Sequence, residues 1–323
     1  MGYTLVATAK NEGPYLFEWV AYHRMIGFDT ILIFQNDSDD GTDKTLRLMH
    51  EMGLVHYRYN RAMPGRHQVK AYITASRNAA FQRSDWAIAL DLDEFLRIRV
   101  GRGHLDDLMG ALPEADEVLL NWRRFGDAGH DRLTRDLVTT RFTRAEPADN
   151  IARGLTAYKA LFKPRIFGRP GIHRPKEPCV PEDQIRTCNG SGLFEPDFTR
   201  GGFRATDPGL RRLAQVNHYM VRDAASFVMK SKRGSGHQAD REISHRYWTR
   251  RNFNDVDDFG LAARQAEIWA AMDAFDRESG GRLSRLRAKS IKLHQARFRD
   301  LLEEPFYRAL YAFCRDRQES RAA

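Results

Sequence analysis

Short apolar runs alternate with amphipathic stretches over the first hundred residues of the chain. Four of these runs are rich in β-branched and aromatic residues, which is typical of buried strands: residues 3–8, 30–34, 54–59 and 86–90. Apolar residues between them recur at helical spacing, with Pro14 at the start and Gly27 at the end of the first such stretch. A further helix is expected over residues 68–81. The alternation predicts an α/β fold with right-handed crossovers and a mainly parallel sheet.

The fourth apolar run ends abruptly in three acids, Asp91, Asp93 and Glu94. Like charges at this spacing repel one another, and burying one of them without a partner is costly. Alternation in an extended segment puts Asp91 and Asp93 on the same side, where both can reach one divalent cation through oxygen. The alternative is an exposed loop with solvated acids, which the strongly apolar strand disfavours. Glu94 either orients this site or only begins the next element.

Polar loops follow three of the expected strands, at residues 10–13, 36–42 and 91–94. The carboxyl ends of parallel strands meet at one edge of the sheet, where α/β proteins bind their ligands. We therefore expect these loops to converge on one site.

Composition narrows the class of protein. The 323 residues carry a formal net charge of +9, so we expect an anionic partner such as a nucleotide, a nucleic acid or an acidic membrane face. The three cysteines show no metal-ligand spacing, and their odd number argues against a disulfide framework. Neither a membrane span nor a signal peptide is recognisable, so a cytoplasmic location is expected.

Four motifs occur in a fixed order over the first hundred residues: KNEGPYLFEWVAYHRMIGFD, FQNDSDDGT, SRNAAF and DLDEF. In order and spacing they resemble the family-two-like glycosyltransferases with a GT-A fold, and more closely the branch with Asp-x-Asp-Glu-Phe that is related to family 92. The resemblance implies a GT-A domain over residues 1–235. Beyond it, apolar residues from Leu261 onward recur at helical spacing, which predicts a helical C-terminal extension over residues 236–323. It also implies a nucleotide-sugar donor, Mn²⁺ or Mg²⁺ held by the Asp-x-Asp motif, and transfer with inversion to a glycan or lipid-linked acceptor. UDP is the expected nucleotide.

The expected metal ligands are Asp91, Asp93 and His218. His218 stands at a family landmark, Asn217-His218-Tyr219, and imidazole is a suitable ligand for Mn²⁺. Asp91 has an alternative role at the ribose or through water, and His218 has an alternative structural role.

The expected donor-binding residues follow the first two strands. Asn11 and Glu12 stand where they can meet the base or ribose, and Asp39 or Asp37 is expected to accept a hydrogen bond from the base imide. The alternative role of Asn11 and Glu12 is to cap the first helix. The alternative for residues 37–40 is a plain loop in which Thr42 caps the second helix.

Basic residues are expected at the diphosphate. Arg77 matches the arginine-asparagine pair of the family, and its guanidinium can bond two oxygens at once. Gln68 and Lys70 are weaker candidates on the same helix. Lys230 and Arg233 either meet phosphate or belong to a solvated basic face.

Inverting transfer requires a base on the acceptor side, and the candidates are Asp127 and Asp183. Asp127 follows a strand in a loop that the resemblance assigns to the acceptor wall. Asp183, with its neighbour Glu182, belongs to a proline-rich stretch that we expect to form an irregular lid over the donor site.

Three further interpretations remain open. The basic helix expected over residues 282–299 either contacts anionic lipid or is simply solvated. A sugar-phosphate nucleotidylyltransferase has a similar sheet but needs a glycine-rich, arginine-containing loop after the first strand, which residues 7–13 lack. A nucleic-acid-binding module is suggested by charge alone.

Overall fold

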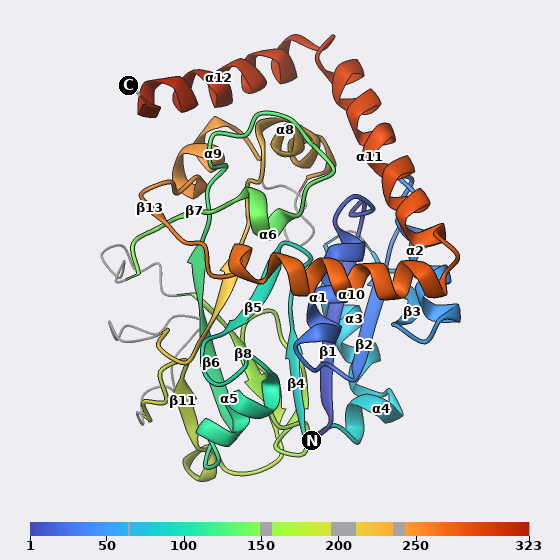
Figure 1. Cartoon of the computed structure of the whole chain (residues 1–323). Helices are drawn as coiled ribbons and strands as arrows, with labels where there is room; N and C mark the ends of the chain where they lie inside the picture. The colour runs from blue at the N-terminus through green and yellow to red at the C-terminus, as the bar shows by residue number, and fades with distance from the viewer. Residues whose placement is uncertain (64, 149–156, 195–210, 235–242, 323) are drawn as a thin grey trace.

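The computed structural model describes residues 1–63, 65–148, 157–194, 211–234 and 243–322. Within these residues the chain forms one large twisted sheet, with helices on both faces and a helical C-terminal segment that crosses one end (Figure 1).

The main sheet has nine strands in the described part of the chain, and two further pairs of short strands lie outside it. The strands of the main sheet are β1 (Tyr3–Ala9), β2 (Thr30–Gln35), β3 (His56–Tyr59), β4 (Trp86–Ala89), β5 (Glu94–Ile98), β6 (Glu117–Arg124), β8 (Tyr158–Phe162), β11 (Thr187–Asn189) and β12 (Ala214–His218). The two short pairs are β7 (Arg144–Ala145) with β13 (Val256–Asp257), and β9 (Phe167–Arg169) with β10 (Lys176–Pro178).

The strand order is β3-β2-β1-β4-β8-β6-β12-β5, with β11 also paired to β6. The first four strands are parallel, and β6, β11 and β12 are parallel to one another. Only β8 and β5 are antiparallel to their neighbours. The prediction of an α/β fold with a mainly parallel sheet is therefore confirmed. The carboxyl ends of β1, β2, β4, β6 and β12 all lie at one edge, toward the top of Figure 1.

The helices are α1 (Leu16–Met25), α2 (Thr42–Glu51), α3 (His67–Ser76), α4 (Ala79–Gln82), α5 (Leu105–Ala111), α6 (Val138–Arg141), α8 (Ala224–Arg233), α9 (His245–Arg251), α10 (Gln265–Glu278), α11 (Arg282–Leu301) and α12 (Pro305–Ala322). Short 3₁₀ turns occur at Glu182–Gln184 and Ala262–Arg264.

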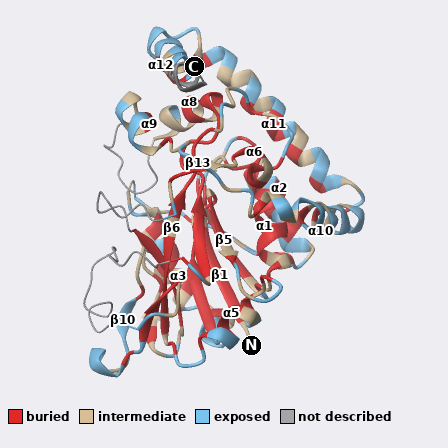
Figure 2. Ribbon diagram, turned by 60° about the vertical axis from the view of Figure 1, so that its left-hand side comes forward, coloured by how far each residue is buried: buried red, intermediate tan, exposed pale blue. Residues whose placement is uncertain are grey.

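Alternation along β1 explains how the sheet is covered on both faces. Leu5 and Ala7 join the core formed with α1 and α2, whereas Val6 joins a second core that includes Ala71 and Tyr72 of α3. Successive side chains of a strand point to opposite faces, so a continuous apolar run is what a strand between two helical layers requires. The strands accordingly form the buried centre of the molecule (Figure 2).

The expected helical C-terminal segment is present. Helix α10 packs on α1, and α11 continues along α2 toward α8, where α12 turns across α8 and α9 (Figure 1). Leu283 and Ile291 of α11 belong to the same apolar core as β1. The boundary expected between residues 235 and 236 lies outside the described residues, and the division into two domains stays a prediction.

Two local expectations were wrong. The helix expected over residues 68–81 is split into α3 and α4, because Asn78 is extended and its side chain accepts a hydrogen bond from the Ala80 amide, which caps a new helix. The proline-rich stretch is not wholly irregular, because it contains the β9–β10 pair and leads into β11.

None of the helices in the described ranges is both long enough and apolar enough to cross a membrane. The cellular location stays a prediction.

Candidate active site

The loops that follow β1 and β2 meet at the carboxyl edge of the sheet. The Asn11 side-chain oxygen accepts a hydrogen bond from the Asp39 amide at 3.0 Å. The Glu12 amide donates to Thr42 Oγ1 at 2.9 Å, and the Gly13 amide donates to Asp40 Oδ2 at 2.9 Å. The expected convergence of these loops is therefore confirmed.

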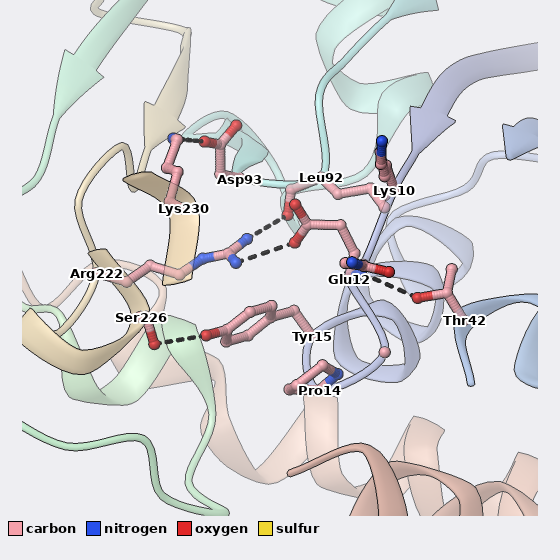
Figure 3. Close-up of polar contacts among 12 residues, drawn as sticks. Lys10, Glu12, Pro14, Tyr15, Thr42, Leu92, Asp93, Arg222, Ser226 and Lys230 are labelled. Atoms are coloured by element: carbon pink, nitrogen blue, oxygen red, sulfur yellow. Dashed lines mark hydrogen bonds and ion pairs between the residues drawn. The ribbon is translucent and has the colours of Figure 1, made fainter. Parts of the chain in front are cut away.

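Glu12 is a buried carboxylate held by two arginines rather than a free helix cap. Arg222, which follows β12, donates to Glu12 Oε2 and to the Leu92 carbonyl oxygen, each at 3.0 Å (Figure 3). Arg233 at the end of α8 forms an ion pair with the other oxygen of Glu12. Burial raises the pKa of Glu12, but Arg222 and Arg233 outweigh it and lower the pKa below its usual value. The Arg222 guanidinium also lies 3.5 Å from the centre of the Tyr15 ring.

Asp93 lies between a lysine and a histidine. Lys230 of α8 donates to Asp93 Oδ2 at 2.9 Å (Figure 3), and His218 Nε2 lies 3.4 Å from Asp93 Oδ1. Burial of Asp93 raises its pKa, but the charges of Lys230 and His218 outweigh that effect and hold the pKa well below its usual value. Asp93 is therefore an anion with one oxygen already paired to an ammonium group.

Asp91 and Glu94 share a second buried lysine. Lys159 of β8 lies 3.0 Å from Asp91 Oδ2 and 3.2 Å from Glu94 Oε2, and Gln68 donates to Asp91 Oδ1 at 2.7 Å. Glu94 Oε2 also accepts a hydrogen bond from the Asp91 amide at 2.8 Å. Glu94 therefore orients the loop in addition to beginning β5. Burial raises the pKa of Glu94 to about 8, although the Lys159 charge opposes this rise. The repulsion expected among the three acids is thus relieved by lysines of this chain.

His218 ends β12 inside the protein. Its ring contacts Trp122 edge-on at 4.4 Å between ring centres, and burial lowers its pKa. Within the described residues its Nδ1 has no hydrogen-bond partner, and the Glu94 Oε1 atom lies 3.6 Å away. The imidazole is thus held with Nε2 directed at Asp93.

Asp93 and His218 are the pair that fits a cation. A cation with ligand bonds of about 2.1 Å places neighbouring ligands about 3 Å apart, close to the separation of Asp93 Oδ1 and His218 Nε2. The described part of the chain contains no group of three or more His, Cys, Asp and Glu side chains arranged to hold a metal ion. A cation here would therefore need ligands from a phosphate or water. Asp91 was also an expected metal ligand. Its two carboxylate oxygens already bond Gln68 and Lys159, so we treat it as a neighbour of the Asp93–His218 pair and not as a ligand.

The cavity beside Asp93 is small. It measures about 50 Å³, and its walls include Glu12, Tyr15, Arg222, Lys230 and Arg233. This volume holds a few water molecules, since one water needs about 10–15 Å³ on this scale. A larger anion would have to take over the oxygen contacts that the carboxylates now make with these basic side chains.

The remaining donor-binding candidates of the second loop have partners at the same edge. Asp37 accepts a hydrogen bond from the Tyr59 hydroxyl at 2.7 Å, and Asp39 forms an ion pair with Arg297 of α11 at 2.7 Å. Asn11, Asp37 and Arg222 adopt positive φ angles of 54°, 46° and 54°. Such strained backbone is typical of functional sites, and here it occurs in three loops that share one edge.

The structure separates Arg77 from this edge. Helix α3 has Gln68 in its first turn, beside Asp91, and runs back along the sheet, so the exposed Arg77 follows its far end. Nine residues of helix span about 14 Å, which puts Arg77 out of reach of a phosphate at Asp93. Gln68, the weaker candidate, is the residue of α3 that reaches the site. Lys70 instead bonds the Arg61 carbonyl oxygen.

The two candidate bases are placed differently. Asp183 lies in an exposed turn just before β11, which pairs with the first residues of β6 and hence with the opposite end of the sheet. Asp127 lies at the correct edge but is 1% exposed, and its carboxylate accepts a hydrogen bond from Asn254 at 2.7 Å. Neither carboxylate has both the position and the exposure that a base requires, and its identity stays a prediction.

Two residues of the site were missed in the sequence, Lys159 and Arg222. Lys159 had a recognisable signal, because it is a charge within the apolar run Tyr158–Phe162. Arg222 had none, since the turn that follows β12 shows no pattern of its own. Lys230 and Arg233 were noted only as alternatives to a solvated face.

Comparison with known proteins identifies relatives over the part of the chain that carries Glu12, Asp91 and Asp93, but not over the part that carries His218, Arg222, Lys230 and Arg233. The model of glycosyltransferase family 92 matches residues 9–177, a little over half of the chain. A family 92 protein of Oryza sativa subsp. japonica is 28% identical over 137 residues, which is 42% of this chain and 23% of the relative. A family 92 protein of Ricinus communis is 25% identical over 140 residues, 42% of this chain and 24% of the relative. The matched part thus spans about a quarter of the length of these relatives.

Solved structures also show similarity. The S. aureus TarS 1–349 structure in complex with UDP-GlcNAc aligns with 87% of this chain and 75% of its own, at 11% identity and a TM-score of 0.37. The glucosyl-3-phosphoglycerate synthase of Mycobacterium tuberculosis aligns with 38% of this chain and 44% of its own, at 17% identity and a TM-score of 0.25.

Proposed function

Because the chain belongs to glycosyltransferase family 92, we propose that it transfers a sugar from a nucleoside diphosphate donor bound at the edge of the sheet around Asp93. The donor is a UDP-sugar, and the acceptor is a glycan or a lipid-linked sugar. Family membership favours this reaction over the nucleotidylyltransferase and nucleic-acid-binding interpretations.

One observation carries the proposal: three basic side chains converge beside Asp93. Arg222, Lys230 and Arg233 come from the turn after β12 and from α8, and all three line one cavity with Glu12 and Asp93. A diphosphate has several anionic oxygens and can replace the carboxylates as their partner. Charge grows on the diphosphate as the sugar leaves, so cations already fixed in place favour the transition state.

Asp93 and His218 are proposed as the two protein ligands of a divalent cation, Mn²⁺ or Mg²⁺. When bound, such an ion neutralises charge on the diphosphate leaving group. Lys230 keeps Asp93 ionised and Glu94 lies beside the second imidazole nitrogen, so both ligands are presented in a fixed orientation. Asp91 and Gln68 lie next to this pair, where they would contact the ribose.

The nucleoside is proposed to lie over the loops that follow β1 and β2. Asn11 and Asp37 are held there in strained conformations, and Asp39 is held by Arg297. A carboxylate among them would accept a hydrogen bond from the imide of uracil, which distinguishes uracil from bases without that donor.

A panel of nucleotides and nucleotide sugars, measured by thermal shift with and without Mn²⁺, tests the proposal. A donor at a hundred times its dissociation constant adds about 2.7 kcal/mol to the free energy of unfolding. We expect UDP and a UDP-sugar to raise the melting temperature more than GDP or inorganic phosphate. If none of the nucleotides raises it under either condition, the proposed donor is wrong.

A matched pair of variants on α8 ties the binding to the site. Lys230→Met removes the ammonium beside Asp93, whereas Lys232→Met removes one that is 56% exposed and pairs loosely with Glu304. We expect UDP binding to weaken at least tenfold in Lys230→Met and to stay unchanged in Lys232→Met. Equal effects in the two variants would mean that the nucleotide binds through general positive charge.

A further inference from the structure

A second and larger cavity lies between α8, α11 and the start of α12, next to the site described above. Its volume is about 460 Å³, within the range of about 300–1,000 Å³ typical of small-molecule pockets. Figure 1 shows how α11 and α12 form a corner around α8.

Apolar side chains form much of the wall. Leu133, Met229, Phe298 and Leu302 line the cavity, and Phe298 meets the Tyr311 ring edge-on at 4.9 Å between ring centres. Such a wall favours a hydrocarbon group, because burying apolar surface is favourable without any specific contact.

The charged residues of the wall are all basic. Arg132 and Arg299 are exposed, and no acidic side chain is among the lining residues. Asp131 lies beside the wall: its Oδ2 atom is 3.6 Å from Arg132 Nε and accepts a hydrogen bond from the Tyr311 hydroxyl at 3.2 Å. The Arg132 side chain is 78% exposed, so its pair with Asp131 is weak. A ligand with an apolar body and an anionic group therefore fits both properties of the wall.

The two cavities share part of their walls. Ser226, Met229 and His294 line both of them. Ser226 also forms a hydrogen bond at 2.7 Å with the hydroxyl of Tyr15, the ring on which Arg222 lies (Figure 3). A molecule bound in the larger cavity therefore lies against the wall of the proposed donor site.

We infer that this cavity binds the acceptor, and that the acceptor is an anionic amphiphile with its apolar chain between α8, α11 and α12. The inference rests on the proposed glycosyl transfer. An acceptor hydroxyl oxygen forms the new bond to the anomeric carbon, while the bond from that carbon to the diphosphate breaks and leaves both electrons on the diphosphate. The hydroxyl proton is released to solvent, so the products are the glycosylated amphiphile, the nucleoside diphosphate and a proton.

Decyl phosphate, used below the concentration at which it aggregates, is a direct probe of the cavity. Its binding is measured by isothermal titration calorimetry beside inorganic phosphate, which lacks the chain, and decyl maltoside, which lacks the charge. We expect decyl phosphate to bind at least tenfold more tightly than either control. An affinity no higher than that of inorganic phosphate would overturn the inference.

Two charge reversals on α11 locate the binding. Arg299→Glu changes a residue of the cavity wall, whereas Lys292→Glu makes the same change at an exposed position of α11 that is not among the lining residues. Both side chains are exposed, so both variants are expected to fold. Decyl phosphate affinity should fall at least tenfold in Arg299→Glu and stay within twofold of the unaltered protein in Lys292→Glu. Equal losses in the two variants would contradict the assigned site.

Measurement of UDP in the same samples separates this inference from the proposed function. UDP and decyl phosphate should bind together, and Arg299→Glu should keep its UDP affinity. Displacement of decyl phosphate by UDP would place both in one site and overturn the inference. If UDP does not bind to the unaltered protein, the donor proposal fails, and with it the acceptor role; the decyl phosphate comparison still shows whether the cavity takes an anionic amphiphile.

Discussion

Lys230 of α8 donates to Asp93 Oδ2 at 2.9 Å and joins two parts of the chain that are 137 residues apart. The ammonium group also donates to the Met220 carbonyl oxygen at 2.7 Å, so it is fixed at the edge of the sheet. The Asp93 charge raises the pKa of Lys230 although burial opposes this, and Lys230 therefore stays protonated. The acidic motif is thus neutralised in part by this chain, and an incoming diphosphate would compete with Asp93 for the same cation.

Replacing Lys159 by Met is expected to destabilise the fold strongly. Lys159 is 1% exposed and lies between Asp91 and Glu94, so its loss leaves the Asp91 carboxylate without its buried cation and removes the charge that opposes the raised pKa of Glu94. Removing one partner of a buried ion pair lowers the free energy of unfolding by about 3–5 kcal/mol. Urea denaturation measures this loss. Lys163→Met is the control, because its pair with Asp116 is partly exposed and should contribute about 1 kcal/mol or less. Similar losses in the two variants would show that Lys159 is not the main counter-charge.

Asp40 is expected to give the protein an acid-sensitive contribution to stability. Burial of Asp40 raises its pKa, but bonds with His294 and Thr42 outweigh it and lower the pKa from 3.8 to about 2. A carboxyl with a lowered pKa stabilises the fold above its unfolded pKa, and this contribution is lost as the pH falls toward 2. The shift corresponds to about 2.5 kcal/mol. Urea denaturation between pH 5 and pH 2 should therefore show Asp40→Asn less stable at pH 5, with the difference shrinking toward pH 2. A difference that is constant over this range would contradict the assigned pKa.

The close packing of Gly13 on α11 predicts a steric effect. A Cβ at residue 13 would lie 2.8 Å from Ser290 Cβ, inside the distance that real Cβ atoms allow. Gly13→Ala should push α11 from the donor loop and cost about 1–3 kcal/mol, as overpacking does. The control is Gly110→Ala in α5, where a Cβ meets no atom within 4 Å and Ala gains up to about 1 kcal/mol of helix propensity. The melting temperature should fall in Gly13→Ala and rise in Gly110→Ala. An unchanged melting temperature in Gly13→Ala would mean that α11 can shift to make room for the methyl group.

Asp183→Asn is expected to leave turnover within about twofold. Asp183 lies in the exposed turn before β11, at the end of the sheet opposite Asp93. Removal of a general base lowers turnover by about two orders of magnitude or more. Turnover with saturating donor and acceptor therefore separates the two roles. A hundredfold loss with normal donor affinity would restore Asp183 as the base.

The sequence predicted those features of the site that depend on strand order and direction. Residues 10–13, 36–42 and 91–94 follow parallel strands, and the structure brings them together. Asp93 and His218 are neighbours for the same reason: Asp93 lies in the loop after β4, and His218 is the last residue of β12. Arg77 was misplaced because α3 runs away from the carboxyl edge, so that only its first turn reaches the site.

The sequence did not predict the long-range ion pairs. Lys159 and Asp91 are 68 residues apart, and Arg222 and Glu12 are 210 residues apart. No local pattern announces a pair of this kind, because it depends on which turns and strands become neighbours in space. The sequence argument for a divalent cation, based on repulsion among the acids, therefore did not include Lys159 and Lys230, which relieve part of that repulsion.

The central claim is that Asp93, with His218, couples a divalent cation to the diphosphate of the donor. Calorimetric titration of UDP into the unaltered protein and into Asp93→Asn, each with and without Mn²⁺, tests it most directly, with circular dichroism as the control for folding. We expect Mn²⁺ to tighten UDP binding to the unaltered protein at least tenfold and to have no effect on Asp93→Asn, whose metal-free affinity should not fall. A folded Asp93→Asn variant that keeps the full Mn²⁺-dependent gain would contradict the claim.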